Sequence, residues 1–272
     1  MKNIMFTGLL LALITNTNCG SSKQNKLIAS EGMPLAPEIF EGNLSEWIYS
    51  PDKKDSVEST MNYQFFSNPT LSWQESANRK IASFFWSMTD FDLDLFVYKP
   101  VTHDFFFERM QSFKKLSDES NAETDYPMIY SLDASCLIDQ SIPEFCQVSM
   151  NAYTFTGGAH PNGTTIYAII SKETGEELHL KDIVSDLVAF DKIAEKKFRE
   201  AREISPLADL EAEDFWFTGG KFASNSNFTV SKDGFHFLFN AYEIAPYAMG
   251  ITEYFIPMNE VKHLLSVKMT LK

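Results

Sequence analysis

The sequence predicts an α+β fold of two small mixed domains, with mostly antiparallel sheets and a few packed helices. Strand-like and helix-like segments alternate along the chain without the regular rhythm of a parallel βαβ fold. Asn-Gly and Asp-Gly pairs stand beside strand-like segments, where they favour the tight turns of antiparallel hairpins. The composition is 44% hydrophobic and includes 24 Phe. That is enough for ring-rich cores in an N-terminal domain over residues 46–150 and a C-terminal domain over residues 151–272.

The predicted N-terminal domain contains two helices between strands. Ser72 and Glu75 have capping-box spacing and precede apolar residues at helical spacing, which predicts a helix from Ser72 to about Met88. A second amphipathic pattern, with lysines near its end, predicts a helix over residues 104–116. Strands are expected over residues 62–66, 126–132 and 146–155.

The predicted C-terminal domain has clearer boundaries. Ser185 is expected to cap an amphipathic helix that ends at Ser205-Pro206, because proline cannot continue a helix. Asp233-Gly234 predicts a tight turn between two strands. The expected strands are 164–170, 227–231, 235–240 and 252–256, and a short helix is expected over 259–265.

The first 19 residues have the features of a bacterial lipoprotein signal peptide. Lys2 precedes an apolar run of about 11 residues, which is too short to span a bilayer. Cys19 follows and is the expected site of lipidation, whereas simple cleavage is the alternative because residues 16–18 depart from the usual lipobox. Both routes export the chain. Lipidation would make it a membrane-anchored lipoprotein of the outer membrane or the cell surface, with residues 20–45 as a polar tether.

The charge balance bears on the kind of partner. Removing a leader that carries Lys2 leaves 22 basic and 37 acidic residues, a net charge of −15 with histidines neutral. Nucleic acid is not expected as a partner, because phosphate recognition needs a basic surface. A basic protein partner is favoured, since opposite fields steer encounter, and solubility alone is the alternative explanation.

Two cysteines lie close together in the middle of the sequence. Cys136 and Cys146 flank a segment with turn-forming Ser141, Pro143 and Glu144. In an oxidising compartment we expect them to form a structural disulfide across a loop. A reactive thiol or a metal pair is the competing interpretation, although neither a base nor a second ligand pair is nearby in the sequence.

A pair of glycines precedes the histidine that first suggests a functional site. Gly157 and Gly158 tolerate positive φ, so we interpret them as a structural turn between strands; a phosphate nest would need a Walker-type pattern that is missing. His160 is expected to tether this turn by a side-chain hydrogen bond or to contact a ligand.

A second loop carries aromatic side chains among small residues. Pro246 restricts the residue before it, and Gly250 gives the chain a flexible exit and is a further predicted turn glycine. Tyr242 and Tyr247 are therefore predicted binding residues, since rings on a rigid loop add contact area at a small cost in entropy. The alternative is that they cover the core.

No motif predicts catalysis, a cofactor or a metal site. Asp90, Asp92 and Asp94 resemble the start of a calcium loop, but Leu95 and Val101 stand where the loop glycine and closing acid should be. The histidines are scattered, and neither a Gly-x-Ser-x-Gly motif nor a spaced acid pair appears. We therefore expect no catalytic residues, no metal, no cofactor and no enzymatic activity.

Three sequence phrases carry a family resemblance: Tyr153-Thr-Phe-Thr-Gly-Gly-Ala-His160, Tyr242-Glu-Ile-Ala-Pro-Tyr-Ala-Met-Gly250, and Ile256-Pro257. In this order, with residues 174–183 between them, they resemble the paired extracellular domains of unknown function in the lysozyme-sensing anti-sigma factor RsiV and the peptidoglycan deacetylase PdaC. The match covers residues 147–265 and extends more weakly back to Tyr63. Neither a sigma-binding segment nor a deacetylase motif accompanies it.

The resemblance implies an α+β fold, with an RsiV-like C-terminal domain, and a binding role in the cell envelope. By similarity to the anti-sigma factor, the expected partner is a lysozyme-type muramidase, and the acidic balance suits such a basic enzyme. By similarity to the deacetylase, the alternative is a peptidoglycan-binding or glycan-binding accessory protein of cell-wall modification. A structural envelope lipoprotein without a discrete ligand is the third possibility.

Overall fold

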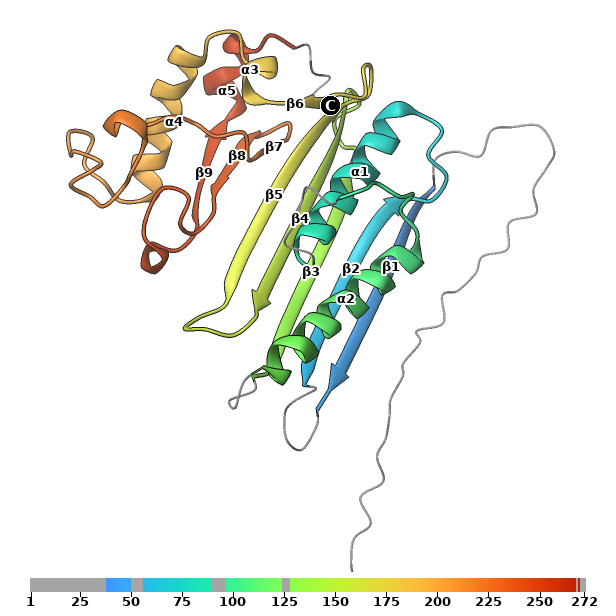
Figure 1. The fold of residues 1–272 in the computed structure, drawn as a ribbon. Helices are drawn as coiled ribbons and strands as arrows, with labels where there is room; N and C mark the ends of the chain where they lie inside the picture. Colours follow the sequence, from blue (N-terminus) through green and yellow to red (C-terminus); the bar gives the residue numbers. More distant parts are fainter. Residues whose placement is uncertain (1–37, 50–55, 90–95, 124–127, 268, 270–272) are drawn as a thin grey trace, which may run out of the picture.

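The computed structural model of the protein describes residues 38–49, 56–89, 96–123, 128–267 and 269. Its strands form two sheets (Figure 1). The larger sheet has the order β1-β2-β3-β4-β5-β6, with bounds Ile39–Ile48, Val57–Phe66, Tyr130–Asp139, Phe145–Phe155, Asn162–Ser171 and Glu177–Leu178. The smaller sheet has the order β7-β8-β9, with bounds Phe228–Val230, Gly234–Phe239 and Thr252–Pro257.

The helices fall into two groups along the chain. Two long helices lie between β2 and β3, and the others accompany the smaller sheet. The α-helices are α1 Ser72–Ser87, α2 His103–Ala122, α3 Leu180–Ile183, α4 Leu187–Ala201 and α5 Met258–Val261. The 3₁₀ turns are η2 Thr218–Gly220, η3 Tyr247–Met249 and η4 Lys262–Leu264. In the part of the chain that is described, no helix is both long and apolar enough to cross a membrane.

The strand pairing confirms the predicted α+β class. Among the described strands, neighbours are antiparallel except β2 and β3, which run parallel. Parallel neighbours need a crossover connection, and the segment with α1 and α2 supplies it. Both helices lie on one face of the larger sheet (Figure 1).

The first core lies between this sheet face and the two helices. Alternate residues of β2 are buried, as the period of a strand with one face against a core requires. Tyr63 of β2 stacks on Phe106 of α2, with ring centroids 3.8 Å apart, and Phe85 of α1 meets the same ring edge-on at 4.9 Å. The aromatic composition thus fills the layer between helices and sheet.

Side-chain amides fix α1 to β2. The Asn78 side chain accepts a hydrogen bond from the Phe66 N–H and donates one to the Phe66 carbonyl, both at 2.9 Å. At the start of the helix, Gln74 Oε1 accepts from the N–H groups of Thr70 and Leu71. The observed cap is therefore formed by Gln74, and the predicted capping box of Ser72 and Glu75 is wrong because the helix begins with Leu71 as its N-cap.

The second core lies between α4 and the smaller sheet. Phe190, Ala194 and Phe198 of α4 recur every four residues and are fully buried. On the sheet side, Phe237 and Tyr254 stack with centroids 5.1 Å apart. The predicted cap of α4 is shifted by one residue: Asp186 accepts from the Ala189 N–H at 2.9 Å, while Ser185 donates to the Leu264 carbonyl.

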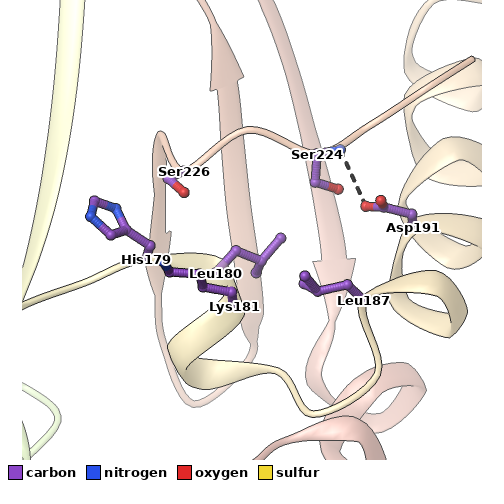
Figure 2. A pocket seen from close by; sticks show the side chains of 7 residues that line it. All are labelled: His179, Leu180, Lys181, Leu187, Asp191, Ser224 and Ser226. Atoms are coloured by element: carbon purple, nitrogen blue, oxygen red, sulfur yellow. Dashed lines mark hydrogen bonds between the residues drawn. The ribbon is translucent and has the colours of Figure 1, made fainter. Parts of the chain in front are cut away.

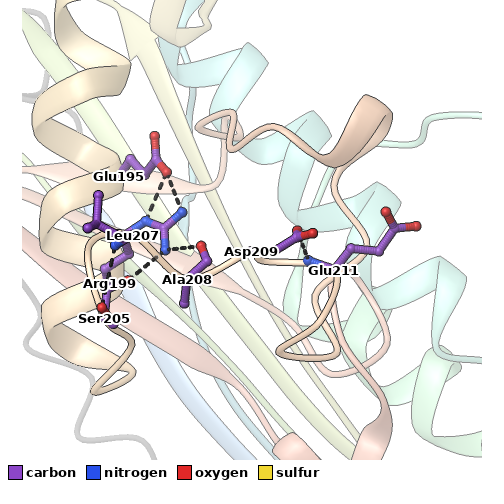
Figure 3. Close-up of polar contacts among 7 residues, drawn as sticks. All are labelled: Glu195, Arg199, Ser205, Leu207, Ala208, Asp209 and Glu211. Carbon is purple, nitrogen blue, oxygen red and sulfur yellow. Dashed lines mark hydrogen bonds and ion pairs between the residues drawn. The ribbon is translucent and has the colours of Figure 1, made fainter.

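Arg199 holds the segment that follows α4 (Figure 3). Its guanidinium pairs with Glu195 one turn earlier on the helix, at 2.8 Å. It also donates to the carbonyls of Ser205 and Ala208, both at 3.0 Å. One planar side chain thus ties the end of α4 to the segment that leads to the second core.

Three amide side chains join the two sheets. Gln147 of β4 donates to the Val230 carbonyl and accepts from the Val230 N–H, both at 2.8 Å. The Asn227 side chain bonds the Tyr167 N–H and the Thr165 carbonyl, and the Asn240 side chain bonds the Thr165 N–H and carbonyl. β5 pairs with β6 at two residues. The two asparagine side chains supply hydrogen-bond partners for backbone groups of β5 beyond that pairing.

The predicted domain limits differ from the observed layers. The boundary between residues 150 and 151 falls inside β4, and β5 completes the first sheet. The predicted tether, residues 20–45, overlaps β1, which pairs with β2 from Ile39 onward. The sequence pattern misses both points because it shows that a segment is a strand without showing which strand it pairs with.

Several predicted elements are observed with small shifts. The first helix ends one residue before Met88, and the second continues to Ala122. The strand predicted over residues 126–132 is displaced and covers Tyr130–Asp139. The signal peptide, Cys19 and the Asp90-x-Asp92-x-Asp94 segment lie outside the described residues.

The predicted disulfide is wrong. Cys136 and Cys146 are buried free thiols. Cys136 pairs across strands with Met150, so Cys146 lies four residues farther along β4. At about 3.3 Å per residue this offset is roughly 13 Å, beyond the reach of a disulfide.

We expect both thiols to be unreactive in the folded protein. Burial raises the pKa of Cys136 and of Cys146 to about 12, so almost no thiolate forms at pH 8. Alkylation followed by peptide mapping should therefore label neither residue in the native protein and both in urea. A disulfide-linked peptide in the unreduced sample would contradict this expectation.

We expect Gln147→Glu to destabilise the fold by about 3 kcal/mol at pH 7, because a buried carboxylate would face the Val230 carbonyl. The deficit should shrink on acidification, since a protonated carboxyl regains a donor. Urea unfolding at two pH values measures both effects. Asn259→Asp, at an exposed position, is the matched control and should change the free energy of unfolding little.

Candidate functional site

The turn between β4 and β5 is built by glycines. Gly157 and Gly158 have φ values of 88° and 94°, which residues with a Cβ adopt at a cost. The chain reverses there, and His160 follows just before β5, with its side chain exposed. The predicted turn glycines therefore place His160 at the tip of a long hairpin.

The loop after β8 meets this tip. Tyr242 has a positive φ of 67°, unusual for a residue with a side chain, and Gly250 closes the 3₁₀ turn η3 with φ 69°. Glu243 fastens the loop by accepting from the Asn240 N–H and the Asn225 side chain, each at 2.8 Å. The rings thus project from a loop held by its own hydrogen bonds.

The three predicted binding residues come together as one group, the tip cluster of His160, Tyr242 and Tyr247. The imidazole of His160 stacks on Tyr247 with centroids 3.7 Å apart and an interplanar angle of 16°. Tyr247 donates its hydroxyl hydrogen to the Pro161 carbonyl at 2.9 Å, and Tyr242 Oη lies 3.3 Å from His160 Nε2. The hydrogen bond of His160 to the Pro161 carbonyl fits the predicted tether of the turn, and the contact with a ligand stays a prediction.

The hydrogen bonds fix the tautomer of His160. Nδ1 lies 2.9 Å from the Pro161 carbonyl, which can only accept, so Nδ1 carries the hydrogen. In the neutral ring, Nε2 is then the acceptor for the Tyr242 hydroxyl. Both nitrogens have partners, so the cluster offers flat rings for contact and holds no activated nucleophile of its own.

A shallow pocket of about 330 Å³ lies elsewhere, beside α3 and the start of α4 (Figure 2). Its polar lining includes His179, Asp191 and Ser224. Asp191 accepts from the Ser224 backbone N–H at 3.2 Å, and the His179 ring points away from both (Figure 2). The residue types of a catalytic triad are present here without its hydrogen-bond chain.

No sequence pattern predicts this pocket, because its lining residues come from separate segments without a shared motif. Across the described residues, no group of three His, Cys, Asp or Glu is arranged to hold a metal ion. The tip cluster was detectable because its glycines and tyrosines form recognisable local patterns.

The fold and the tip cluster define an α+β protein in which a helix-covered sheet carries a smaller, phenylalanine-rich unit on its far edge. Residues 180–259, which make up most of that unit, match the family described as "Protein of unknown function (DUF3298)". The chain therefore contains a DUF3298 domain.

Solved structures share the fold over most of the chain. A DUF3298 family member from Bacteroides fragilis NCTC 9343 is 22% identical, with a TM-score of 0.62, over 85% of this chain and 93% of that chain. A DUF3298 family protein from Pseudomonas aeruginosa PAO1 is 17% identical, with a TM-score of 0.54, over 86% of this chain and 95% of that chain. At these identities the likeness concerns the fold. None of the curated proteins compared with this chain matches it.

We expect Tyr247→Ala to loosen the hairpin tip, because it removes both the stacked ring and the hydrogen bond to Pro161. Backbone amides of residues 156–162 should exchange with deuterium faster, while the core amides of β4 keep their protection. Val188→Ala, an exposed truncation on α4, is the control. Unchanged exchange at the tip would show that Tyr247 does not hold it.

Proposed function

We propose that this chain is an exported, lipid-anchored and non-catalytic binding module of the bacterial cell envelope, and that its partner is a lysozyme-type muramidase. The observation that carries the proposal is the tip cluster. Its rings are held in place before any partner arrives, and Tyr242 is 55% exposed. Pre-ordered aromatic side chains make good contact anchors because little side-chain entropy is lost on binding.

The charge of the chain supports a basic partner. The net charge of −14 gives a field that attracts basic enzymes and repels nucleic acid. The resemblance to the extracellular domains of the anti-sigma factor RsiV suggests lysozyme among such enzymes. Binding at the surface of the envelope would then sequester or sense the muramidase, and the lipid on Cys19 would keep the module at the membrane.

A peptidoglycan-binding accessory role is the alternative. It is favoured by the exposed ring of Tyr242 in the tip cluster, since such a ring also stacks on sugars. Its salt dependence separates it from the first proposal, because stacking on a glycan depends weakly on ionic strength.

We expect the purified protein to bind c-type lysozyme and to lower its muramidase activity, with an affinity that falls as salt is raised. Calorimetry and turnover measured on the same mixtures, at low and physiological ionic strength, test both parts. Tyr242→Ala should weaken binding about tenfold, as loss of an exposed aromatic anchor does. Val188→Ala is the control for truncating an exposed apolar side chain.

No heat of binding at either salt concentration would refute the lysozyme proposal. Retention on purified peptidoglycan that is insensitive to salt would then favour the accessory role. Binding of lysozyme with equal affinity by the wild type and Tyr242→Ala would place the contact away from the tip cluster.

A further inference from the structure

The face of the larger sheet opposite α1 and α2 is covered only in part. The smaller unit packs against it at one end, where Phe145 and Ile169 join the second core and Gln147 bonds Val230. Over β1, β2 and β3 the outward side chains are exposed or half-buried. We call this region the open face. Its outward positions from β1 to β4 are Glu41, Asn43, Ser45, Trp47, Glu58, Thr60, Asn62, Gln64, Ser131, Asp133, Ser135, Leu137, Asp139, Ser149, Asn151 and Tyr153.

The open face carries large apolar and aromatic side chains that are exposed to solvent. Trp47 is 70% exposed, Leu137 56% and Tyr153 52%. Tyr49, just past β1, is exposed and hydrogen-bonds Glu58. Aromatic side chains of this kind are enriched at the centres of protein interfaces.

The charge of the open face has one sign. Its outward strand positions include the acids Glu41, Glu58, Asp133 and Asp139, and no lysine or arginine stands among them. The helix side of the same sheet carries both signs, with ion pairs such as Lys114 to Asp118. Acids without bases at the described outward positions of these strands favour a cationic partner.

A hollow of about 390 Å³ opens in this face where β2 and β3 stop pairing. Glu41, Asn43, Asn62, Gln64 and Leu137 line it from the open face, and Gly42, Tyr63 and Cys136 complete the lining from the core side. Asn43 donates to Asn62 at 2.6 Å, and Gln64 accepts from the Ile138 N–H at 2.9 Å. A carboxylate, amide oxygens and an apolar wall suit the head and stem of a lysine or arginine side chain.

We propose that the open face is the main docking surface for a basic protein, whose lysine or arginine side chains enter the hollow beside Glu41 while Trp47 and Tyr153 anchor the contact. The inference rests on the proposed function and names the surface for the partner. Strands of this length and number span about 30 Å by 15 to 20 Å, the scale of one side of a small interface. The face is also continuous with the tip cluster, because Tyr153 lies beside Gly163, three residues after His160.

The negative charge of the open face bears on whether its ligand is a protein or a glycan. Peptidoglycan carries carboxylates on its peptides, which the four acids would repel. A basic protein gains from the same acids and also covers the rings. The open face therefore favours the protein.

The test combines an isosteric double variant with a control of equal charge change. Glu41→Gln with Asp133→Asn removes two acids from the open face, and Glu108→Gln with Glu123→Gln removes two exposed acids from α2 and its C-terminus. Affinity is measured by calorimetry for c-type lysozyme and for cytochrome c, a basic protein without muramidase activity, at low and physiological salt. We expect the face variant to bind at least tenfold more weakly at low salt, and the control to change less than threefold. Trp47→Ala should weaken binding at both salt concentrations.

The outcomes separate this inference from the proposed function. Lysozyme binding that neither the face variant nor Trp47→Ala changes would overturn the docking surface and leave the function intact. Loss of cytochrome c binding in the face variant, with no lysozyme binding to the wild type, would uphold the surface and refute the muramidase. Failure of both basic proteins to bind, or binding to purified peptidoglycan that is lost in Trp47→Ala, would overturn the inference. Thermal unfolding of each variant shows that the comparison is made on folded protein.

Discussion

Side-chain amides that pair with backbone groups are the interaction on which this structure depends. An amide offers one donor side and one acceptor side, like a peptide group, so it can extend a hydrogen-bond ladder where no strand is available. Asn78 does so for the end of β2, Gln147 for β7, and Asn227 and Asn240 for the outer edge of β5. Each bond adds only about 1 kcal/mol net, but a buried N–H or carbonyl left without a partner costs more. The amides therefore decide where the smaller unit attaches.

The attachment of the smaller unit determines where the two candidate surfaces, the open face and the tip cluster, are located. Because Gln147, Asn227 and Asn240 bind at β4 and β5, the smaller unit covers that end of the larger sheet and leaves β1 to β3 uncovered. The same attachment brings the loop with Tyr242 and Tyr247 against the β4–β5 hairpin. A protein interior tolerates few unpaired polar groups, so the position of the unit is set by hydrogen bonds as well as by the phenylalanine core.

The sequence predicted local structure well and long-range pairing poorly, for physical reasons. Helical spacing after Ser72 and the Asp233-Gly234 turn depend on neighbouring residues, and both elements are observed. The cysteine prediction failed because it assumed a loop where the chain continues as strands, and the four-residue offset between Cys136 and Cys146 follows from register. The glycines and tyrosines of the site were found separately. In the fold, Tyr242 contacts His160, which lies 82 positions earlier in the sequence. Local sequence periodicity does not predict such a contact. The sequence did not predict the open face, because the alternation of polar and apolar residues along a strand does not show which face of the sheet a second unit will cover.

The hydrogen bonds of Gln147, Asn227 and Asn240 form a junction between the two sheets. This junction also determines how the open face and the tip cluster lie relative to each other. Tyr153 of the open face and His160 of the tip cluster belong to one hairpin, whereas Tyr242 and Tyr247 belong to the smaller unit. A partner that touches both surfaces must bridge the junction, so its binding energy depends on the geometry that Gln147 and the two asparagines impose. A partner that touches one surface is insensitive to that geometry. Changes at Gln147, which is buried at the junction, therefore distinguish a single extended interface from two separate ones.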